Sequence, residues 1–150
     1  MLLSDLLTPE RIKIPLAARS KDELLRELVG VVADAGKGDR EDVLRAVRER
    51  EAVLSTGIGH GVAIPHGKSA AVNELRMAAG RVAEPVDFDA LDGQPVSLVF
   101  LLVGPESAAG PHIKALSRIS RIVRRDDVRE RLIAARNAQE FLQALQEAEA

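Results

Sequence analysis

The sequence predicts an α/β domain in three layers, with a mixed β-sheet flanked by helices. Apolar residues recur at helical spacing in segments near both ends of the chain, and the runs between them alternate or are continuously apolar, which is typical of strands. The length of 150 residues is enough to bury a proper core. Because we find no internal repeat, low-complexity segment or linker, we treat residues 1–150 as a single domain.

A short strand and two helices are expected first. Apolar residues alternate over residues 12–16, which predicts the strand. Ser20 and Glu23 form a capping-box pattern for the first helix, and closely spaced glycines end it. Asp39 can cap the second helix, which is expected to end in the charged run of residues 48–51.

Two longer strands follow in the middle of the chain, over residues 75–82 and 96–103. The second is almost entirely apolar, as expected of a strand that is covered on both faces. Residues 85–95 are rich in Asp, Gly and Pro, which predicts a loop between the two strands. Gly104 and Pro105 end the second strand.

Three helices complete the prediction. The first runs from about Pro111, the second starts at Asp126 or Asp127, and Asn137 with Glu140 caps the third. The apolar positions expected to face the core are Ile113, Leu116, Ile119 and Val123 in the first of these helices, and Phe141, Leu142 and Leu145 in the last.

The composition excludes several classes of protein. With three Phe and no Trp or Tyr, the chain lacks the aromatic platforms that stack on nucleic-acid bases, and a net charge of −2 gives no reason to expect nucleic acid as a partner. Without Cys, disulfides and thiolate metal sites are excluded. No segment approaches the ~20 apolar residues of a membrane helix, and the N-terminus lacks the pattern of a signal peptide, so we expect a cytoplasmic protein without membrane insertion.

The most informative segment is glycine-rich and contains two of the three histidines. It reads G-I-G-H-G-V-A-I-P-H-G-K over residues 57–68. Glycines allow close approach of a ligand to the backbone, and proline restricts the turn. We therefore expect a buried strand that ends in a tight turn, with His66 held at the tip between Pro65 and Gly67. His60, in contrast, is expected to be an exposed loop histidine.

His66 is the candidate nucleophile. A neutral imidazole is a good nucleophile near pH 7 and can hold a phosphoryl group as a phosphoramidate, whose weak P–N bond lets the group move on. Phosphoryl transfer needs little more than positioning and charge compensation. Candidate groups for the phosphate oxygens are Arg50, the hydroxyls of Ser55 and Thr56, the backbone amides of the glycine segment, and His112.

His112 begins a helix and is expected to lie on its core side. A protonated imidazole would be unfavourable at the positive end of a helix dipole, whereas a neutral imidazole that donates to a phosphate would be favourable. Each of these residues also has an ordinary structural interpretation. His66 could cap a strand, His112 could be a satisfied core histidine, and Arg50 and Lys68 could be solvated surface cations.

Taken together, these residues resemble the type-2 enzyme IIA domain of the bacterial phosphoenolpyruvate-dependent phosphotransferase system, the fructose, mannitol and nitrogen-regulatory group. The resemblance covers essentially the whole chain from Leu6 onwards. It is carried by four segments: Arg50-Glu51 with Ser55 to Gly59, Val62 to Gly67, Val86 to Gly93, and Gly104-Pro105 followed by His112 to Leu116.

The resemblance implies the fold predicted above and a role for each site residue. His66 would take the phosphoryl group from phospho-HPr on Nε2 and pass it to a histidine- or cysteine-bearing enzyme IIB. His112 would stabilise the phosphorylated state and Arg50 would compensate charge, with Ser55, Thr56 and Gly67 as binding residues. No cofactor or metal is implied. Because both partners are proteins, we expect a shallow site ringed by apolar side chains.

Two alternatives remain at this stage. The protein could be a nitrogen-regulatory switch in which the charge on His66 alters binding to a target protein, with no sugar involved. It could also be a zinc enzyme that uses its three histidines. The identity of the sugar, the enzyme IIB partner and the oligomeric state are not encoded in any pattern that we recognise.

Overall fold

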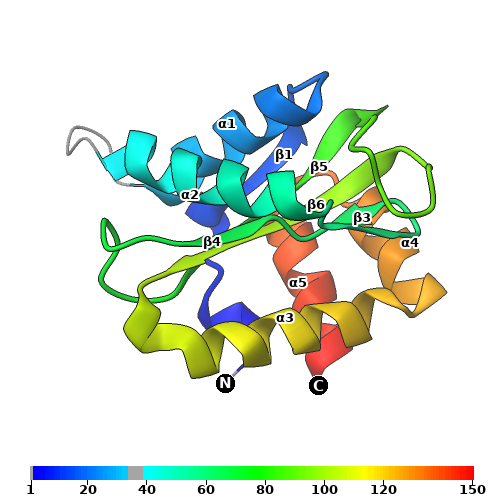
Figure 1. The fold of residues 1–150 in the computed structure, drawn as a ribbon. Helices are drawn as coiled ribbons and strands as arrows, with labels where there is room; N and C mark the ends of the chain where they lie inside the picture. Colours follow the sequence, from blue (N-terminus) through cyan, green and yellow to red (C-terminus); the bar gives the residue numbers. More distant parts are fainter. Residues whose placement is uncertain (1, 34–38) are drawn as a thin grey trace.

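A six-stranded mixed sheet lies between two layers of helices in the computed structural model (Figure 1). The structure describes residues 2–33 and 39–150. The strands are β1 (Ile12–Leu16), β2 (Gly57–Gly59), β3 (Val62–Ala63), β4 (His66–Lys68), β5 (Arg76–Val86) and β6 (Val96–Gly104). Their order in the sheet is β1-β5-β6-β3-β2, and β4 pairs with β6 outside this path. The predicted three-layer α/β architecture is confirmed.

Helices cover both faces of the sheet. They are α1 (Lys21–Val32), α2 (Asp39–Val53), α3 (Ala109–Val123), α4 (Asp126–Ala134) and α5 (Ala138–Glu149), with short 3-10 turns at Leu3–Asp5, Pro9–Arg11 and Glu106–Ala108. Figure 1 shows α1 and α2 on one face and α3 and α5 on the other. Among the described helices, none combines the length and the apolar character that crossing a membrane requires.

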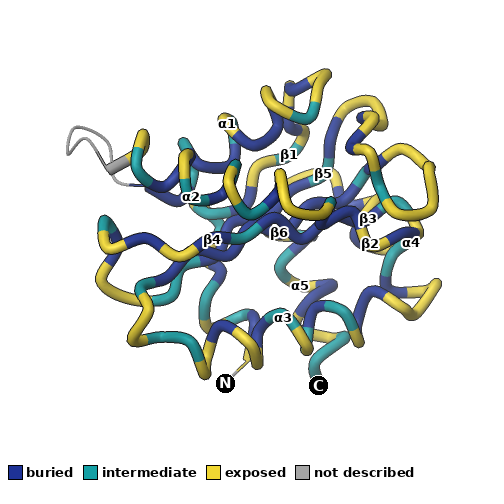
Figure 2. The backbone as a smooth tube through the Cα atoms, viewed as in Figure 1, coloured by how far each residue is buried: buried dark blue, intermediate teal, exposed yellow. Residues whose placement is uncertain are grey.

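Strand β6 divides the hydrophobic core into two. Val99, Leu101 and Val103 pack in the cluster that includes residues of α1 and α2, whereas Phe100 and Leu102 pack in the cluster of α3, α4 and α5. Successive side chains of a strand point to opposite faces, so a strand between two helical layers must be apolar at every position. Strand β6 is accordingly dark blue along most of its length in Figure 2.

Local capping signals predicted helix starts correctly. The Ser20 hydroxyl accepts a hydrogen bond from the backbone N–H of Glu23, and the Asn137 side chain accepts one from the backbone N–H of Glu140. The predicted end of the first helix, at Ala35, Gly36 and Gly38, lies outside the described residues. Helix α2 does not end in the charged run of residues 48–51 but continues to Val53.

Two other boundaries differ from the prediction. Strand β5 extends through Pro85 to Val86, and its pairing with β6 is irregular between Arg81 and Val86, where a proline is tolerated because the regular ladder is interrupted. Helix α3 begins before Pro111, at Ala109.

The predicted core face of α3 was wrong at one position. Ile113 is 67% exposed, and the buried positions of the helix are His112, Ala115, Ile119, Ile122 and Val123. Apolar character alone does not distinguish a core position from an exposed apolar residue, which is common on protein surfaces. The consequence is that the helix presents His112 inward and Ile113 outward.

Candidate functional site

Strand β4 positions His66 beside the central strand. His66 pairs with Leu102 and Gly67 with Val103, in parallel with β6. The expectation of a turn with His66 at its tip was therefore wrong. The Pro65 carbonyl accepts a hydrogen bond from the N–H of Leu102 at 3.1 Å. Because of this bond, the chain stays hydrogen-bonded to β6 at Pro65 and does not turn away from the sheet.

Gly67 brings this strand into contact with the backbone of α2. A Cβ atom at this position would lie 3.0 Å from both the Ala46 carbonyl carbon and the Val47 nitrogen, closer than ordinary van der Waals contact. Only a glycine allows this approach without displacing the helix. One helical turn beyond Ala46, α2 carries Arg50, which is thereby placed at the same cavity as His66.

The ring of His66 is held in one orientation. Its Nδ1 lies 2.9 Å from the carbonyl oxygen of Ile64. Since a carbonyl oxygen can only accept, the proton of the neutral ring is on Nδ1 and the lone pair is on Nε2. Burial lowers the pKa of His66, and the positive charge of Arg50 lowers it further, against the opposing effects of the Ile64 carbonyl and Glu51. His66 is therefore neutral at pH 7.

His112 lies against His66 but in different surroundings. The two ring centroids are 5.6 Å apart, with the rings inclined at 70°. His112 is only 3% exposed, and neither ring nitrogen has a hydrogen-bond partner among the described residues. Burial, followed by the nearby charges of His66 and Lys68, lowers the pKa of His112 to about 4. It is a neutral imidazole whose buried N–H has no acceptor among the residues that the structure describes, and unpaired buried donors are uncommon in folded proteins.

A cavity of about 550 Å³ brings these groups together. It is lined by Ala46, Glu49, Arg50, His66, Gly67, Lys68, His112, Ile113 and Leu116. The Arg50 guanidinium also donates to the Leu54 carbonyl at 2.8 Å, which holds the end of α2. The Lys68 ammonium lies 3.5 Å from a carboxylate oxygen of Glu106 at the surface. The cavity therefore combines two histidines with two cations.

Ser55 and Thr56 are not among the residues of this cavity. The Ser55 hydroxyl donates to the Phe88 carbonyl at 3.2 Å. The hydroxyl and the backbone N–H of Thr56 both donate to the carboxylate of Glu51, a buried residue that also pairs with Lys21 at 3.0 Å. The two hydroxyls thus hold the segment that precedes β2, and the structure does not bring them to His66.

His60 lies apart from the other two histidines. His60 is exposed, has a positive φ of 57° in the turn between β2 and β3, and donates its backbone N–H to Asp92. It does not line the cavity of the other two histidines. Within residues 2–33 and 39–150, no group of three His, Asp or Glu side chains lies close enough to hold a metal ion. A three-histidine zinc site is therefore not formed.

Sequence reasoning missed several residues of the site. Ala46 and Glu49 share the site-facing side of α2 with Arg50, and Leu116 lies one turn after His112 on α3. Helical spacing of four residues from Arg50 and from His112 would have identified Ala46 and Leu116, and Glu49 lies three positions after Ala46. The buried carboxylate of Glu51 was also missed, because no local pattern indicates which acidic residue of a charged run will be buried.

Comparison with known proteins agrees with the geometry. The family model of the phosphoenolpyruvate-dependent sugar phosphotransferase system, EIIA 2, matches residues 5–148. A nitrogen regulatory protein of Bradyrhizobium diazoefficiens is 40% identical over 97% of this chain and 95% of its own length. A fructose-specific EIIA component of Haloferax volcanii is 37% identical over 94% of this chain and 93% of its own.

A solved structure extends the likeness to three dimensions. The crystal structure of the nitrogen regulatory protein IIA-Ntr from Neisseria meningitidis superimposes with a TM-score of 0.89 at 36% identity, and the match covers 95% of this chain and 98% of that one. The chain with the His66 and His112 cavity belongs to the EIIA type 2 family of the phosphoenolpyruvate-dependent sugar phosphotransferase system.

Proposed function

We propose that this chain is a cytoplasmic phosphocarrier that accepts a phosphoryl group from phospho-HPr on Nε2 of His66 and passes it to an enzyme IIB of fructose or mannitol type. The observation that carries the proposal is the hydrogen bond from His66 Nδ1 to the Ile64 carbonyl. It keeps the proton on one nitrogen and leaves the lone pair on the other, as a nucleophile requires.

The chemistry balances with the groups present. The Nε2 lone pair of His66 attacks phosphorus, a new P–N bond forms, and the P–N bond to the donor histidine breaks with its electron pair returning to the donor ring. The proton stays on Nδ1, where it is donated in the hydrogen bond to the Ile64 carbonyl, so a neutral imidazole leaves in the second transfer. There the P–Nε2 bond breaks as the acceptor histidine or cysteine attacks.

His112 and Arg50 would act on the charge of the transferred group. The buried N–H of His112 is a neutral donor that has no acceptor among the described residues, and a phosphate on His66 would supply one. Arg50 lines the same cavity and would compensate the charge that spreads over the phosphate oxygens in the transition state. Gly67 would contribute by allowing β4 to lie close to α2, whereas Ser55 and Thr56 would contribute by stabilising the segment that precedes β2.

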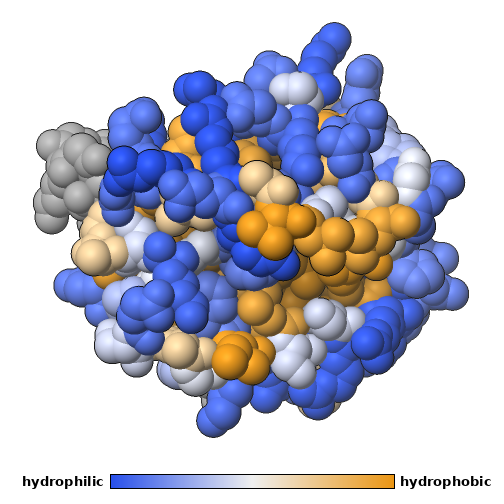
Figure 3. Space-filling view, in the orientation of Figure 1, coloured by the Kyte–Doolittle hydropathy of each residue, from blue (hydrophilic) through white to orange (hydrophobic). Residues whose placement is uncertain are grey.

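The surface around the cavity suits a protein as donor and acceptor. Val53, Leu54, Ile58, Leu91 and Ile113 are exposed large apolar residues. Figure 3 shows hydrophobic surface gathered between the end of α2, the strands β2 and β3, and α3. An exposed apolar patch of this kind marks interaction sites, and a transient complex buries less than about 1,200 Å².

Incubation with phosphoenolpyruvate, enzyme I and HPr tests the proposal. We expect one acid-labile phosphate per chain, located on His66 by peptide mapping and transferred when a cognate enzyme IIB is added. Absence of phosphate on the wild-type protein would reject the phosphocarrier function.

A second candidate function is a phosphorylation-dependent regulatory switch. It is favoured by the likeness, over nearly the whole chain, to nitrogen regulatory proteins in both sequence and structure. In that case the negative charge gained at His66 would change binding to a target protein instead of feeding sugar uptake. A panel of enzyme IIB domains separates the two: transfer to one of them supports transport, whereas phosphorylation without any acceptor supports regulation.

A further inference from the structure

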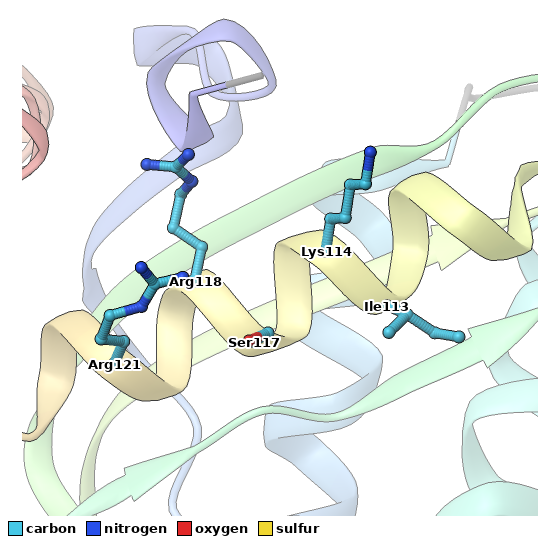
Figure 4. A pocket seen from close by; sticks show the side chains of 5 residues that line it. All are labelled: Ile113, Lys114, Ser117, Arg118 and Arg121. Carbon is cyan, nitrogen blue, oxygen red and sulfur yellow. The ribbon is translucent and has the colours of Figure 1, made fainter.

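The outer side of α3 carries a basic stripe, which we define as Lys114, Arg118 and Arg121. No acidic residue occurs within Ala109–Val123, and two more arginines follow directly, although the net charge of the whole chain is −2. With Ile113 and Ser117, the stripe lines a surface cavity of about 450 Å³ (Figure 4). Positive charge is therefore concentrated on one side of one helix.

Most of this charge is not neutralised within the molecule. Among the described residues, Lys114 and Arg121 have no ion-pair or hydrogen-bond partner. Arg118 reaches Glu149 only at 3.7 Å, and that carboxylate already accepts hydrogen bonds from the backbone N–H groups of Leu3 and Ser4. The stripe thus retains the electrostatic potential of at least two unpaired cations.

The other wall of the His66 cavity is different. On α2, Arg45 pairs with Asp42, and Arg48 pairs with Asp22 at 2.7 Å. Arg45 and Arg48 are matched by these acidic neighbours, and Asp39–Val53 carries four arginines against five acidic residues, so Arg50 is the cation that α2 brings to the cavity. A helix with unmatched cations and no acidic residue of its own indicates electrostatic complementarity to something outside the chain.

Ile113 connects the stripe to the phosphoryl site. It lines both the stripe cavity and the His66 cavity, and it is two-thirds exposed. A protein that covers His66 and contacts Ile113 would therefore extend over Lys114 and the rest of the stripe. Nucleic acid fits less well, because the chain has no Trp or Tyr for base stacking and the cations form a short stripe with an apolar residue at its edge.

We propose that a protein partner that docks over His66 carries an acidic surface, which lies along α3 and pairs with Lys114 and Arg121. This inference rests on the proposed phosphocarrier function and adds the chemistry of the partner. The acidic surface would raise the association rate and fix the orientation in which the partner's phosphorylated or accepting side chain meets His66.

The test compares two charge-reversal variants of equal net charge. Lys114→Glu/Arg121→Glu changes the stripe, and Arg19→Glu/Arg40→Glu changes two exposed arginines away from α3. Second-order rates are measured for phosphoryl transfer from phospho-HPr and to enzyme IIB. We expect the stripe variant to slow at least one of these transfers by about tenfold or more at low ionic strength, with the loss largely removed by high salt. The control variant should match the wild type.

Phosphoramidate provides the readout that separates docking from chemistry. This small donor needs no protein surface: its P–N bond breaks, ammonia leaves, and the phosphoryl group forms the bond to His66 Nε2. We expect both variants to react with it at the wild-type rate, which also shows that they are folded.

Three outcomes would overturn the inference. Unchanged rates with phospho-HPr and with every enzyme IIB that accepts the group would show that no acidic surface is used. Faster transfer in the stripe variant would indicate a basic partner surface instead. A wild-type protein that takes no phosphoryl group from either donor would reject the proposed function, and this inference with it.

Discussion

His66 and His112 share one cavity, yet their surroundings differ in nearly every respect. His66 is half-buried on a strand, and its Nδ1 is occupied by the Ile64 carbonyl. His112 is buried on a helix, and neither of its ring nitrogens has a partner among the described residues. Burial lowers both pKa values, more strongly for His112. The difference suits the two residues to the separate roles that we propose for them, nucleophile and hydrogen-bond donor.

The two residues also come from different sides of the cavity. His66 is held on β4, which Gly67 brings against α2, whereas His112 comes from α3 on the other face of the sheet. A backbone hydrogen bond orients the first, and helix packing against the core orients the second. Variants that change either histidine or its surroundings, and a change of pH, test this difference.

Replacing the nucleophile should have the largest effect. We expect His66→Ala to abolish incorporation of acid-labile phosphate, because the other imidazole of the cavity, His112, is buried. His60→Ala is the matched control from the same glycine-rich segment and should be phosphorylated normally. Phosphate retained by His66→Ala would show that the two histidines have been assigned the wrong roles.

Replacing the donor should weaken the phosphorylated state without preventing its formation. We expect His112→Gln to accept phosphate on His66 but to lose it about 10–100 times faster, since a hydrogen bond that stabilises a charged group is typically worth about 1.5–3 kcal/mol. The measurement is the half-life of the labelled phosphoprotein at pH 7. Ser117→Ala, an exposed change on the same helix, should keep the wild-type half-life, and an equal half-life in His112→Gln would remove the donor role.

Adding a methyl group at Gly67, where β4 contacts α2, should destabilise the folded protein. We expect Gly67→Ala to lower the free energy of unfolding by about 2 kcal/mol, because its methyl group would overlap backbone atoms of Ala46 and Val47. Urea denaturation measures this. Gly110→Ala, where no atom lies within 4 Å of the added Cβ, is the control and should be neutral or slightly stabilising. Equal stability of both variants would mean that α2 can move away freely.

Lowering the pH should reduce the free energy of unfolding, because His112 is buried in its neutral form, and this effect should be smaller than those above. Its pKa is about 4 in the folded protein and about 6.5 in the unfolded chain, so the unfolded state binds the proton first as the pH falls. The contribution of neutral His112 is complete above pH 6.5 and is lost progressively towards pH 4.

We expect this loss to amount to about 1–2 kcal/mol after allowance for solvent screening. The free energy of unfolding, measured at several pH values between 4 and 7.5, should fall less steeply in His112→Gln than in the wild type. Parallel curves would show that His112 is protonated without cost in the folded state.

Much of the fold was predictable because its signals are local or periodic. The caps at Ser20 and Asn137 involve residues three positions apart. The continuous apolar run of β6 indicates that both faces of this strand are covered. The choice of His66 over His60 was also available from the sequence, because the flanking proline and glycine distinguish it.

Other features depend on contacts between distant segments. The strand at His66 requires pairing with β6, and the necessity of glycine at position 67 is set by Ala46 and Val47 on another element. Ser55 and Thr56 look like phosphate ligands in the sequence, but in the fold their hydroxyls are taken up by Phe88 and Glu51. A local sequence pattern does not indicate which hydrogen-bond partner a hydroxyl will have in the fold.

The layered α/β architecture, the family and the two histidines for which we propose a role follow from the sequence alone, because periodicity, capping and a distinctive histidine motif are properties of neighbouring residues. Only the tertiary structure decided that His66 is oriented through Nδ1, that His112 is buried without a hydrogen-bond partner among the described residues, and that α3 presents unmatched cations beside them. Those properties arise from burial and from distances across the fold, which a linear pattern does not contain.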